Sequence, residues 1–276
     1  MALFKNYFRS PTAIFGLILL TFIILVALTA DWIFPGNPLA LAGRPLQWPL
    51  TNSKFYLGTD QAGRNIAALL FHGARVSLII GIIATLIAIL IGIVIGAISG
   101  FYGGWADDIL MRFTEGFQIL PNFLLLLVAV AIFGSTINIV VIAIGVVSWP
   151  PVARLTRAEF LSLRNREFVQ AGKTLGMSSF RLMFKEILPN ALPPVIMYAS
   201  VILSTAILME SALAFLNLSD PNISSWGNSV GAGRAVLRQQ WYVSAIPGIA
   251  ILLTVLSASL VGQGLNDTLN PRLKKW

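Results

Sequence analysis

Long apolar stretches alternate with shorter polar connections along the chain, and their lengths suit helices that cross a membrane. A helix needs about 20 mostly apolar residues to span the hydrocarbon core of a bilayer. Four stretches come near this length or exceed it, at residues 13–30, 76–98, 191–216 and 243–261. A further stretch at residues 117–147 is too long for one span and long enough for two short ones, with a turn at Gly134-Ser135-Thr136. The pattern predicts an all-α membrane protein with six transmembrane helices.

Two of these stretches admit a second interpretation. Lys5 and Arg9 precede the first stretch, as in a signal peptide, but the stretch is longer than a typical signal-peptide core and Leu28-Thr29-Ala30 is a poor cleavage site. We therefore expect an uncleaved first transmembrane helix. Within residues 117–147, Pro121 is expected to kink the first helix. A single tilted helix followed by a re-entrant segment is the alternative for that stretch.

The polar connections predict how the chain is organised. Residues 31–55 form a loop rich in Pro, Gly and Asn, after which Thr59-Asp60 offers an N-cap for a short amphipathic helix that ends at His72. Residues 102–116 and 217–242 are expected to be polar connections. We divide the chain into an N-terminal segment and a core. The first, residues 1–75, contains the first transmembrane helix and an external loop; the second, residues 76–276, contains five helices and a loop at residues 150–190.

Composition and charge support a membrane protein and orient it. The chain is 57% hydrophobic and 11% charged, with a mean hydropathy of +0.82, whereas a soluble domain carries about 25% charged residues. The formal charge of +8 comes from basic residues beside the apolar stretches, and these do not form the interleaved basic and aromatic patch of a nucleic-acid binder. With six spans, the basic N-terminus, loop and C-terminus share one side, which the positive-inside rule assigns to the cytoplasm. We therefore expect both termini to be cytoplasmic and no nucleic-acid partner.

The residue types exclude several kinds of chemistry. The absence of Cys excludes disulfides, thiolate metal sites and Cys nucleophiles. His72, the sole histidine, cannot build a His-based metal site, and we expect it at a helix end at the outer membrane interface. Residues 171–174 end like a phosphate-binding loop, but Glu167 stands where that motif requires Gly. We expect no catalytic residue, no metal site and no cofactor bound by this chain.

Small residues recur at every fourth position of the second predicted span, at Ala84, Ala88, Gly92, Gly96 and Gly100. Between helices in lipid, such a ridge lets two backbones approach closely. The ridge predicts that Gly92, Gly96 and Gly100 form a helix-packing surface. A chance recurrence in a span rich in Gly and Ala is the alternative.

Glu210 lies inside the fifth predicted span, about two turns from its outer end. An ionisable group inside a span is costly and usually functional. Two interpretations stay open: a residue that lines the pathway or its gate, and a packing residue hydrogen-bonded to a neighbour. Because proton-coupled transporters use chains of such groups, an isolated Glu210 argues against proton coupling.

A basic, helix-forming segment at residues 150–190 separates the fourth and fifth predicted spans. It holds seven Lys and Arg residues against three acids. Its pattern predicts two short helices that are hinged at Gly176 and closed by Pro189. A segment of this kind on the cytoplasmic side is suited to docking another protein, which indicates a transport subunit driven by a partner.

The same segment resembles the coupling loop of ABC importer permeases. That family's signature reads Glu-Ala-Ala, three residues, Gly, nine residues, Ile, one residue, Leu-Pro. The matching positions here are Gln170, Ala171, Gly172, Gly176, Leu188 and Pro189, with Gln170 in place of Glu, Gly172 in place of the second Ala and Glu186 in place of Ile. The resemblance implies that these six residues couple the chain to a separate ATPase. The three replacements are expected to change details of the contact with the ATPase and not its existence.

The resemblance extends over nearly the whole chain, to the C-type subunit of the dipeptide, oligopeptide and nickel group of these permeases. The matching segments are residues 9–11, 57–64, 73–78, 100–104, 210–216, 225–227, 247–248, 264–267 and 270–273. Asn65 stands where that group usually has Asp, and Asn217 where it usually has Gly. The fold implied is the type I ABC importer permease, with residues 76–276 as its permease core and residues 150–190 as its cytoplasmic coupling loop.

The resemblance also implies partners and a location. The partners are a second permease subunit in a heterodimer, two ATP-binding cassette ATPase subunits that use the ATP, and an external solute-binding protein. The location is the lipid bilayer of the bacterial inner membrane. Peptides are the first expectation for the substrate, and nickel complexes, glutathione and opine-like compounds stay open.

Two other classes of function are the alternatives to an ABC importer permease. A secondary transporter or channel would act without ATPase subunits and often carries inverted repeats, and the sequence shows no convincing internal repeat. An intramembrane enzyme would need paired catalytic groups at matching depth, and Glu210 is the only one available.

Overall fold

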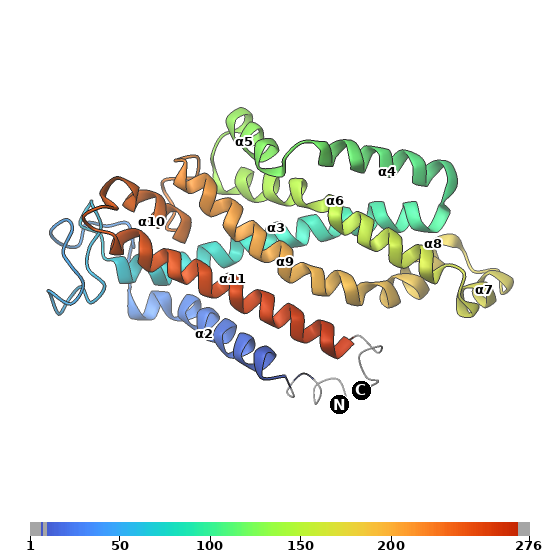
Figure 1. The fold of residues 1–276 in the computed structure, drawn as a ribbon, viewed down its shortest axis with the longest axis horizontal. Coiled ribbons are helices and arrows are strands. Elements are labelled where there is room, and N and C mark those ends of the chain that lie inside the picture. The colour runs from blue at the N-terminus through green and yellow to red at the C-terminus, as the bar shows by residue number, and fades with distance from the viewer. Residues whose placement is uncertain (1–6, 8–9, 270–276) are drawn as a thin grey trace.

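The computed structural model describes residue 7 and residues 10–269, whose regular structure is helical apart from one isolated bridge between Thr59 and Asn65. Five helical runs in this part of the chain are long and apolar enough to cross a membrane, and they lie lengthwise in one bundle (Figure 1). They are α2 (Pro11–Ile33), α3 (Ile66–Tyr102), α6 (Ile137–Leu163), the run Ser179–Phe215 that ends in α9 (Leu188–Phe215), and α11 (Tyr242–Leu269). A sixth span results if α4 (Gly104–Ile119) and α5 (Asn122–Phe133) cross together.

The helix that contains the second span, α3, begins at Ile66, later than the predicted N-cap at Thr59-Asp60. It ends at Tyr102, beyond the predicted end of the span at residue 98. The Asn65 side chain accepts a hydrogen bond from the backbone N–H of Ala67 at 3.0 Å and so caps α3. Asp60 instead stabilises a turn, because its Oδ1 accepts from the N–H groups of Ala62 and Arg64. The amphipathic helix that was predicted to run into the second span is the first part of α3, with a later start, and the predicted boundary at residue 75 lies inside that helix.

The predicted polar connection at residues 102–116 is also helical, since most of it belongs to α4. Asp107 lies in the first turn of α4, where a negative charge is favourable against the helix dipole. The helix stops before Pro121, and α5 continues at an angle of 82°. The predicted turn at residues 134–136 does separate α5 from α6.

The small residues of α3 lie against α6. A Cβ atom at Gly92 would overlap Val152, one at Gly96 would overlap Thr156 and the backbone of Ala153, and one at Gly100 would overlap Phe160. A glycine of α6 packs against α3 in the same way, because a Cβ atom at Gly145 would overlap Ile87. The two helices pack with their backbones close together, and α9 and α11 complete the bundle beside them (Figure 1).

The polar segment before α11 folds back onto one end of the bundle as α10 (Trp226–Gly233). Trp226 is 2% exposed. Its indole N–H donates to the carbonyl of Leu70 at 2.9 Å, and its backbone N–H donates to Ser77 Oγ at 3.1 Å. Both acceptors belong to α3, so α10 is fixed to the same helix that carries the ridge.

Candidate functional site

The candidate coupling loop contains a short helix, α7 (Glu167–Thr174), at one end of the bundle (Figure 1). The N–H of Met177 donates to the carbonyl of Gly172, and the N–H of Gly176 donates to the carbonyl of Lys173, both at 3.0 Å. These two bonds form the Schellman motif, in which the residue after the C-cap adopts the left-handed conformation. Gly176 has φ of +74°, so the break between the two helices depends on glycine at this position.

One face of α7 is buried and the other is exposed. Val169 and Gly172 are buried, and a Cβ atom at Gly172 would come within 2.7 Å of Leu182 Cδ2. Gly172 is the position at which the chain departs from the family's second Ala, and the close packing of Leu182 accounts for the smaller residue. Gln170, Ala171 and the other outward residues of α7 are exposed.

Two large apolar side chains project from the coupling loop beside these residues. Leu175 is 79% exposed and Phe180 is 72% exposed. Phe180 packs against Phe184, with ring centroids 4.7 Å apart. Lys173, Arg181 and Lys185 are exposed on the same segment. The loop therefore presents a mixed apolar and basic face, which is the chemistry of a protein-binding surface.

The second helix of the loop is not short, which corrects the sequence prediction. A single helical turn, α8 (Ser179–Arg181), leads through a π-helical segment, η1 (Leu182–Ile187), directly into α9. Leu188 and Pro189 occupy the first turn of α9, where a proline costs little because N–H groups there can lack an intrahelical partner. Pro189 therefore does not close the segment. Residues 150–163, which were expected in the loop, continue α6 through Pro150 and Pro151.

An ionic contact near the coupling loop joins α4 to α6. Arg157 Nε donates to Asp107 Oδ1 at 2.5 Å and Arg157 Nη2 donates to Asp107 Oδ2 at 2.6 Å, while Ser99 of α3 donates to the same carboxylate. The pattern of the sequence did not reveal this contact, because the residues lie 50 positions apart and Asp107 was assigned to a connection. It fixes the start of α4 against the C-terminal parts of α3 and α6.

Glu210 lies on α9 at the opposite end of the bundle, and its side chain faces α10. It is 1% exposed, and its Oε1 accepts a hydrogen bond from Ser225 Oγ at 2.6 Å. Ser225 also accepts from the N–H of Asn228 at 3.0 Å and so caps α10. A Cβ atom at Gly227 would come within 2.7 Å of Glu210 Oε2. These contacts connect Glu210 to the position of α10, and its part in the pathway or gate stays a prediction.

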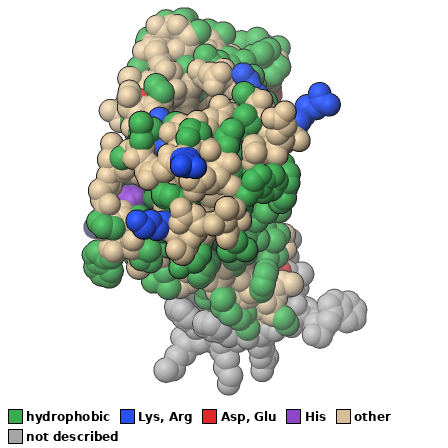
Figure 2. All heavy atoms as spheres, turned by 90° about the vertical axis from the view of Figure 1, so that its left-hand side faces the viewer, with side chains coloured by type: hydrophobic (Ala, Val, Ile, Leu, Met, Phe, Trp, Pro, Cys, Tyr) green, Lys and Arg blue, Asp and Glu red, His purple; other side chains and the backbone are tan. Residues whose placement is uncertain are grey.

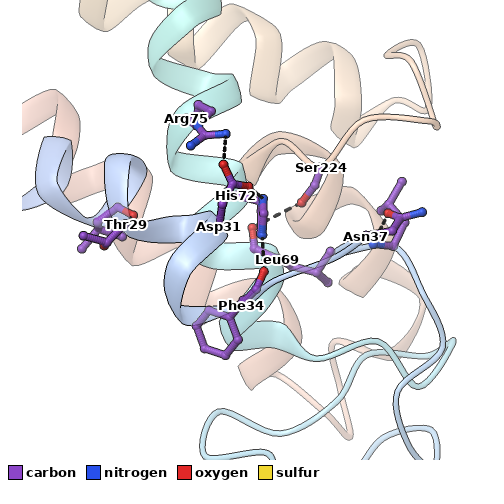
Figure 3. Close-up of polar contacts among 10 residues, drawn as sticks. Thr29, Asp31, Phe34, Asn37, Leu69, His72, Arg75 and Ser224 are labelled. Carbon is purple, nitrogen blue, oxygen red and sulfur yellow. Dashed lines mark hydrogen bonds and ion pairs between the residues drawn. The ribbon is translucent and has the colours of Figure 1, made fainter.

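His72 lies within α3 rather than at a helix end. Its Nε2 is 2.9 Å from the carbonyl oxygen of Phe34, and its Nδ1 is 3.8 Å from Asp31 Oδ1 (Figure 3). Arg75 pairs with the other oxygen of Asp31 at 2.8 Å. The cluster ties the end of α2 to α3, and these contacts give His72 a structural role.

Comparisons with known proteins match nearly the whole chain. Residues 92–275 match the binding-protein-dependent transport system inner membrane component, and residues 2–49 match the N-terminal transmembrane domain of oligopeptide transport permease C. The dipeptide transport system permease protein DppC of Escherichia coli is 41% identical over 99% of this chain and 93% of its own length. The di/tripeptide transport system permease protein DppC of Pseudomonas aeruginosa is 37% identical over 98% of this chain and 91% of its own length.

Solved structures show the same fold at lower sequence identity. An inward-facing structure of the MetNI methionine ABC transporter has a TM-score of 0.60 at 16% identity, over 72% of this chain and 96% of that chain. An amino acid ABC transporter has a TM-score of 0.54 at 16% identity, over 71% of this chain and 91% of that chain. These matches support the fold alone.

The family model and the relatives identify the chain as a transport permease rather than an enzyme. The chain belongs to the binding-protein-dependent inner membrane components of ABC importers, in their oligopeptide permease C branch. It is a multi-pass membrane protein, and in such systems partner ATPases hydrolyse the ATP and a binding protein supplies the solute.

Proposed function

We propose that this chain is one of two different permease subunits of a peptide importer in the bacterial inner membrane. The exposed face of α7, with Leu175 and Phe180 beside it, is the observation that carries the proposal. One of two ATP-binding cassette subunits docks on the surface that Gln170, Ala171, Gly172, Gly176, Leu188 and Pro189 build, to which the buried Gly172 contributes through the packing of α7. The other ATPase subunit docks on the second permease, and the chain itself binds no cofactor.

The second permease covers the side of the molecule formed by α4 and α5. Large apolar side chains stand out from these helices, with Phe113 60%, Ile119 80% and Phe133 69% exposed. Between α4 and α6 lies a cleft of about 1010 Å³ lined by charged groups that include Asp108, Arg112 and Glu115. A second membrane subunit on this side would cover both these apolar side chains and the cleft.

Peptides are the proposed substrate. The chain matches dipeptide and di/tripeptide permeases at 37–41% identity over almost its full length, which supports peptides above the nickel, glutathione and opine-like alternatives. A solute-binding protein outside the membrane delivers the peptide.

Uptake by the assembled transporter tests the substrate. Vesicles that contain this chain, the second permease, both ATPase subunits and the binding protein should accumulate labelled dialanine when ATP is supplied. Excess unlabelled dipeptide should suppress that uptake, and excess nickel or glutathione should not. Accumulation of nickel or glutathione in place of dialanine would contradict the peptide assignment.

Both termini and the coupling loop are proposed to be cytoplasmic, on the evidence of the charge distribution. Because the chain has no Cys, single cysteines can be introduced without removing others. Pro45, Asn165 and Asn222 are all exposed. Cysteine at position 45 or 222 should react with a membrane-impermeant thiol reagent added to intact cells, and cysteine at position 165 should react only after the membrane is opened. Labelling of position 165 in intact cells would reverse the proposed orientation.

A further inference from the structure

A pocket of about 420 Å³ with a mixed polar and apolar lining opens at the end of the molecule opposite the coupling loop. This end faces the viewer in Figure 2. The pocket lies between the loop that precedes α3 and the segment that joins α9 to α10, with Ser135 from the turn between α5 and α6 at its edge. Its volume falls within the range of about 300–1,000 Å³ that is usual for small-molecule sites.

Arg64 supplies the positive charge of this pocket. A tight turn fixes its backbone, since its N–H donates to Asp60 Oδ1 at 2.8 Å and its carbonyl accepts from the N–H of Asp60 at 3.0 Å. Gly63 permits the turn with a φ of +80°. The next residue, Asn65, caps α3. Arg64 therefore projects from a rigid base rather than from a mobile loop.

The guanidinium of Arg64 has an N–H donor that makes no hydrogen bond within the described residues. Its Nε is buried and has no hydrogen-bond partner among the described residues, and none of their carboxylates lies within ion-pair distance of it. A buried donor without a partner costs about 1–3 kcal/mol. Because Nε is closed to solvent, a ligand in the pocket would accept from the Nη groups of Arg64 instead.

The other groups of the pocket favour a ligand that carries both charges. Asp60 is 4% exposed and also lines the pocket. Beside these two charged groups are the hydroxyls of Ser135, Ser219 and Ser229 and the amide of Asn217. A simple inorganic anion would meet Arg64 but also the repulsion of Asp60. A free peptide is a zwitterion with a terminal carboxylate, backbone amides and an ammonium group, and it suits the whole set.

We propose that this pocket receives the C-terminal carboxylate of a substrate peptide and that Arg64 binds that carboxylate. This inference rests on the proposed function. It adds which group of the substrate is bound, the carboxylate, and which residue binds it, Arg64. The guanidinium fork can donate two parallel hydrogen bonds to one carboxylate, which is stronger and more directional than a single bond. Placed at the outer end, the pocket would hold the peptide as it leaves the binding protein.

A cysteine in place of Ser135 tests the proposal in the fully assembled transporter. Reaction of Ser135→Cys with a negatively charged thiosulfonate reagent is followed on this chain, in vesicles with the outer face exposed and without the binding protein. Dialanine should slow the reaction about tenfold or more at a concentration well above its dissociation constant, because occupied sites do not react. Dialaninamide, which lacks the carboxylate, should give little protection.

The protection should depend on Arg64. Adding Arg64→Gln should abolish protection by dialanine, and Arg64→Lys should retain part of it, because lysine keeps the charge and loses the fork. Arg238→Gln removes a charge from an exposed residue outside the pocket and should leave protection unchanged. Copurification of the ATPase subunits with each variant shows that assembly is intact.

Three results would overturn the inference. They are equal protection by dialanine and dialaninamide, protection that survives Arg64→Gln, and Arg64-dependent protection by the binding protein alone, which would make a protein carboxylate the ligand. Uptake of labelled dialanine by the same vesicles, measured after the binding protein and ATP are added, separates this inference from the proposed function. Normal uptake without protection rejects only the pocket, and absent uptake rejects the peptide assignment itself.

Discussion

Replacing Gly176 by valine is expected to uncouple the transporter while leaving the chain in the membrane. Gly176 holds a φ of +74° with no atom within 4 Å of the position a Cβ would occupy, so the backbone conformation, and not space, requires glycine. A β-branched residue in this conformation costs about 1–3 kcal/mol. The two hydrogen bonds that end α7 would be strained, and the exposed face of α7 would move relative to Phe180.

We expect peptide uptake by Gly176→Val to fall by about tenfold or more, since about 1.4 kcal/mol in a coupling equilibrium changes it tenfold. Copurification of the ATPase subunits and ATP-dependent uptake are the two measurements. Gly176→Asn is the matched control, because asparagine tolerates the left-handed conformation better than other residues, and it should retain most activity. Unchanged uptake and unchanged copurification in the valine variant would remove Gly176 from the coupling site.

Replacing Arg157 by alanine is expected to have the second largest effect. The Arg157 side chain is 35% exposed and that of Asp107 is 13% exposed, so part of the interaction is screened by solvent. The two hydrogen bonds to one carboxylate nevertheless hold α4 against α6, and a hydrogen bond to a charged group contributes about 1.5–3 kcal/mol. Without Arg157, the Asp107 carboxylate would keep Ser99 but lose its positive partner.

The Arg157→Ala chain should therefore assemble poorly with the second permease and unfold at lower temperature. Thermal stability of the purified complex and copurification of the second permease measure this. Arg154→Ala is the comparison on the same helix, because Arg154 also reaches α4 but through one exposed hydrogen bond, to Gln118 at 3.2 Å, and it should have the smaller effect. Equal behaviour of the two alanine variants would show that the contact between Asp107 and Arg157 does not position α4.

The sequence predicted which stretches form spans more accurately than it predicted the residues at which the helices begin and end. Apolar length identified the helices, because the bilayer imposes that length whatever the neighbours are. The ridge of small residues was visible for a similar reason, since a helix repeats its face about every fourth residue. The start of α3 was misplaced because Asp60 and Asn65 are both good capping residues, and only the turn around Gly63 decides between them.

Contacts between distant segments could not be derived from the sequence. The residues around Asp107 do not indicate that Arg157 is its partner. Those around Glu210 do not indicate that Ser225 is its partner. The pocket around Arg64 depends on four separate segments of the chain. The prediction that Pro189 closes the coupling loop was wrong for a different reason. A proline can follow the end of a helix or occupy its first turn, and Pro189 lies in the first turn of α9.

The central claim is that this chain moves solute only as part of an ATP-driven assembly, and reconstitution tests it most directly. The purified chain alone in liposomes should show no uptake of labelled dipeptide, with or without ATP. Uptake should begin only when the second permease, the ATPase subunits, the binding protein and ATP are all present, and leaving out any one of them should abolish it. Accumulation of dipeptide by the chain alone, driven by an ion gradient and independent of ATP, would contradict the account and make it a secondary transporter.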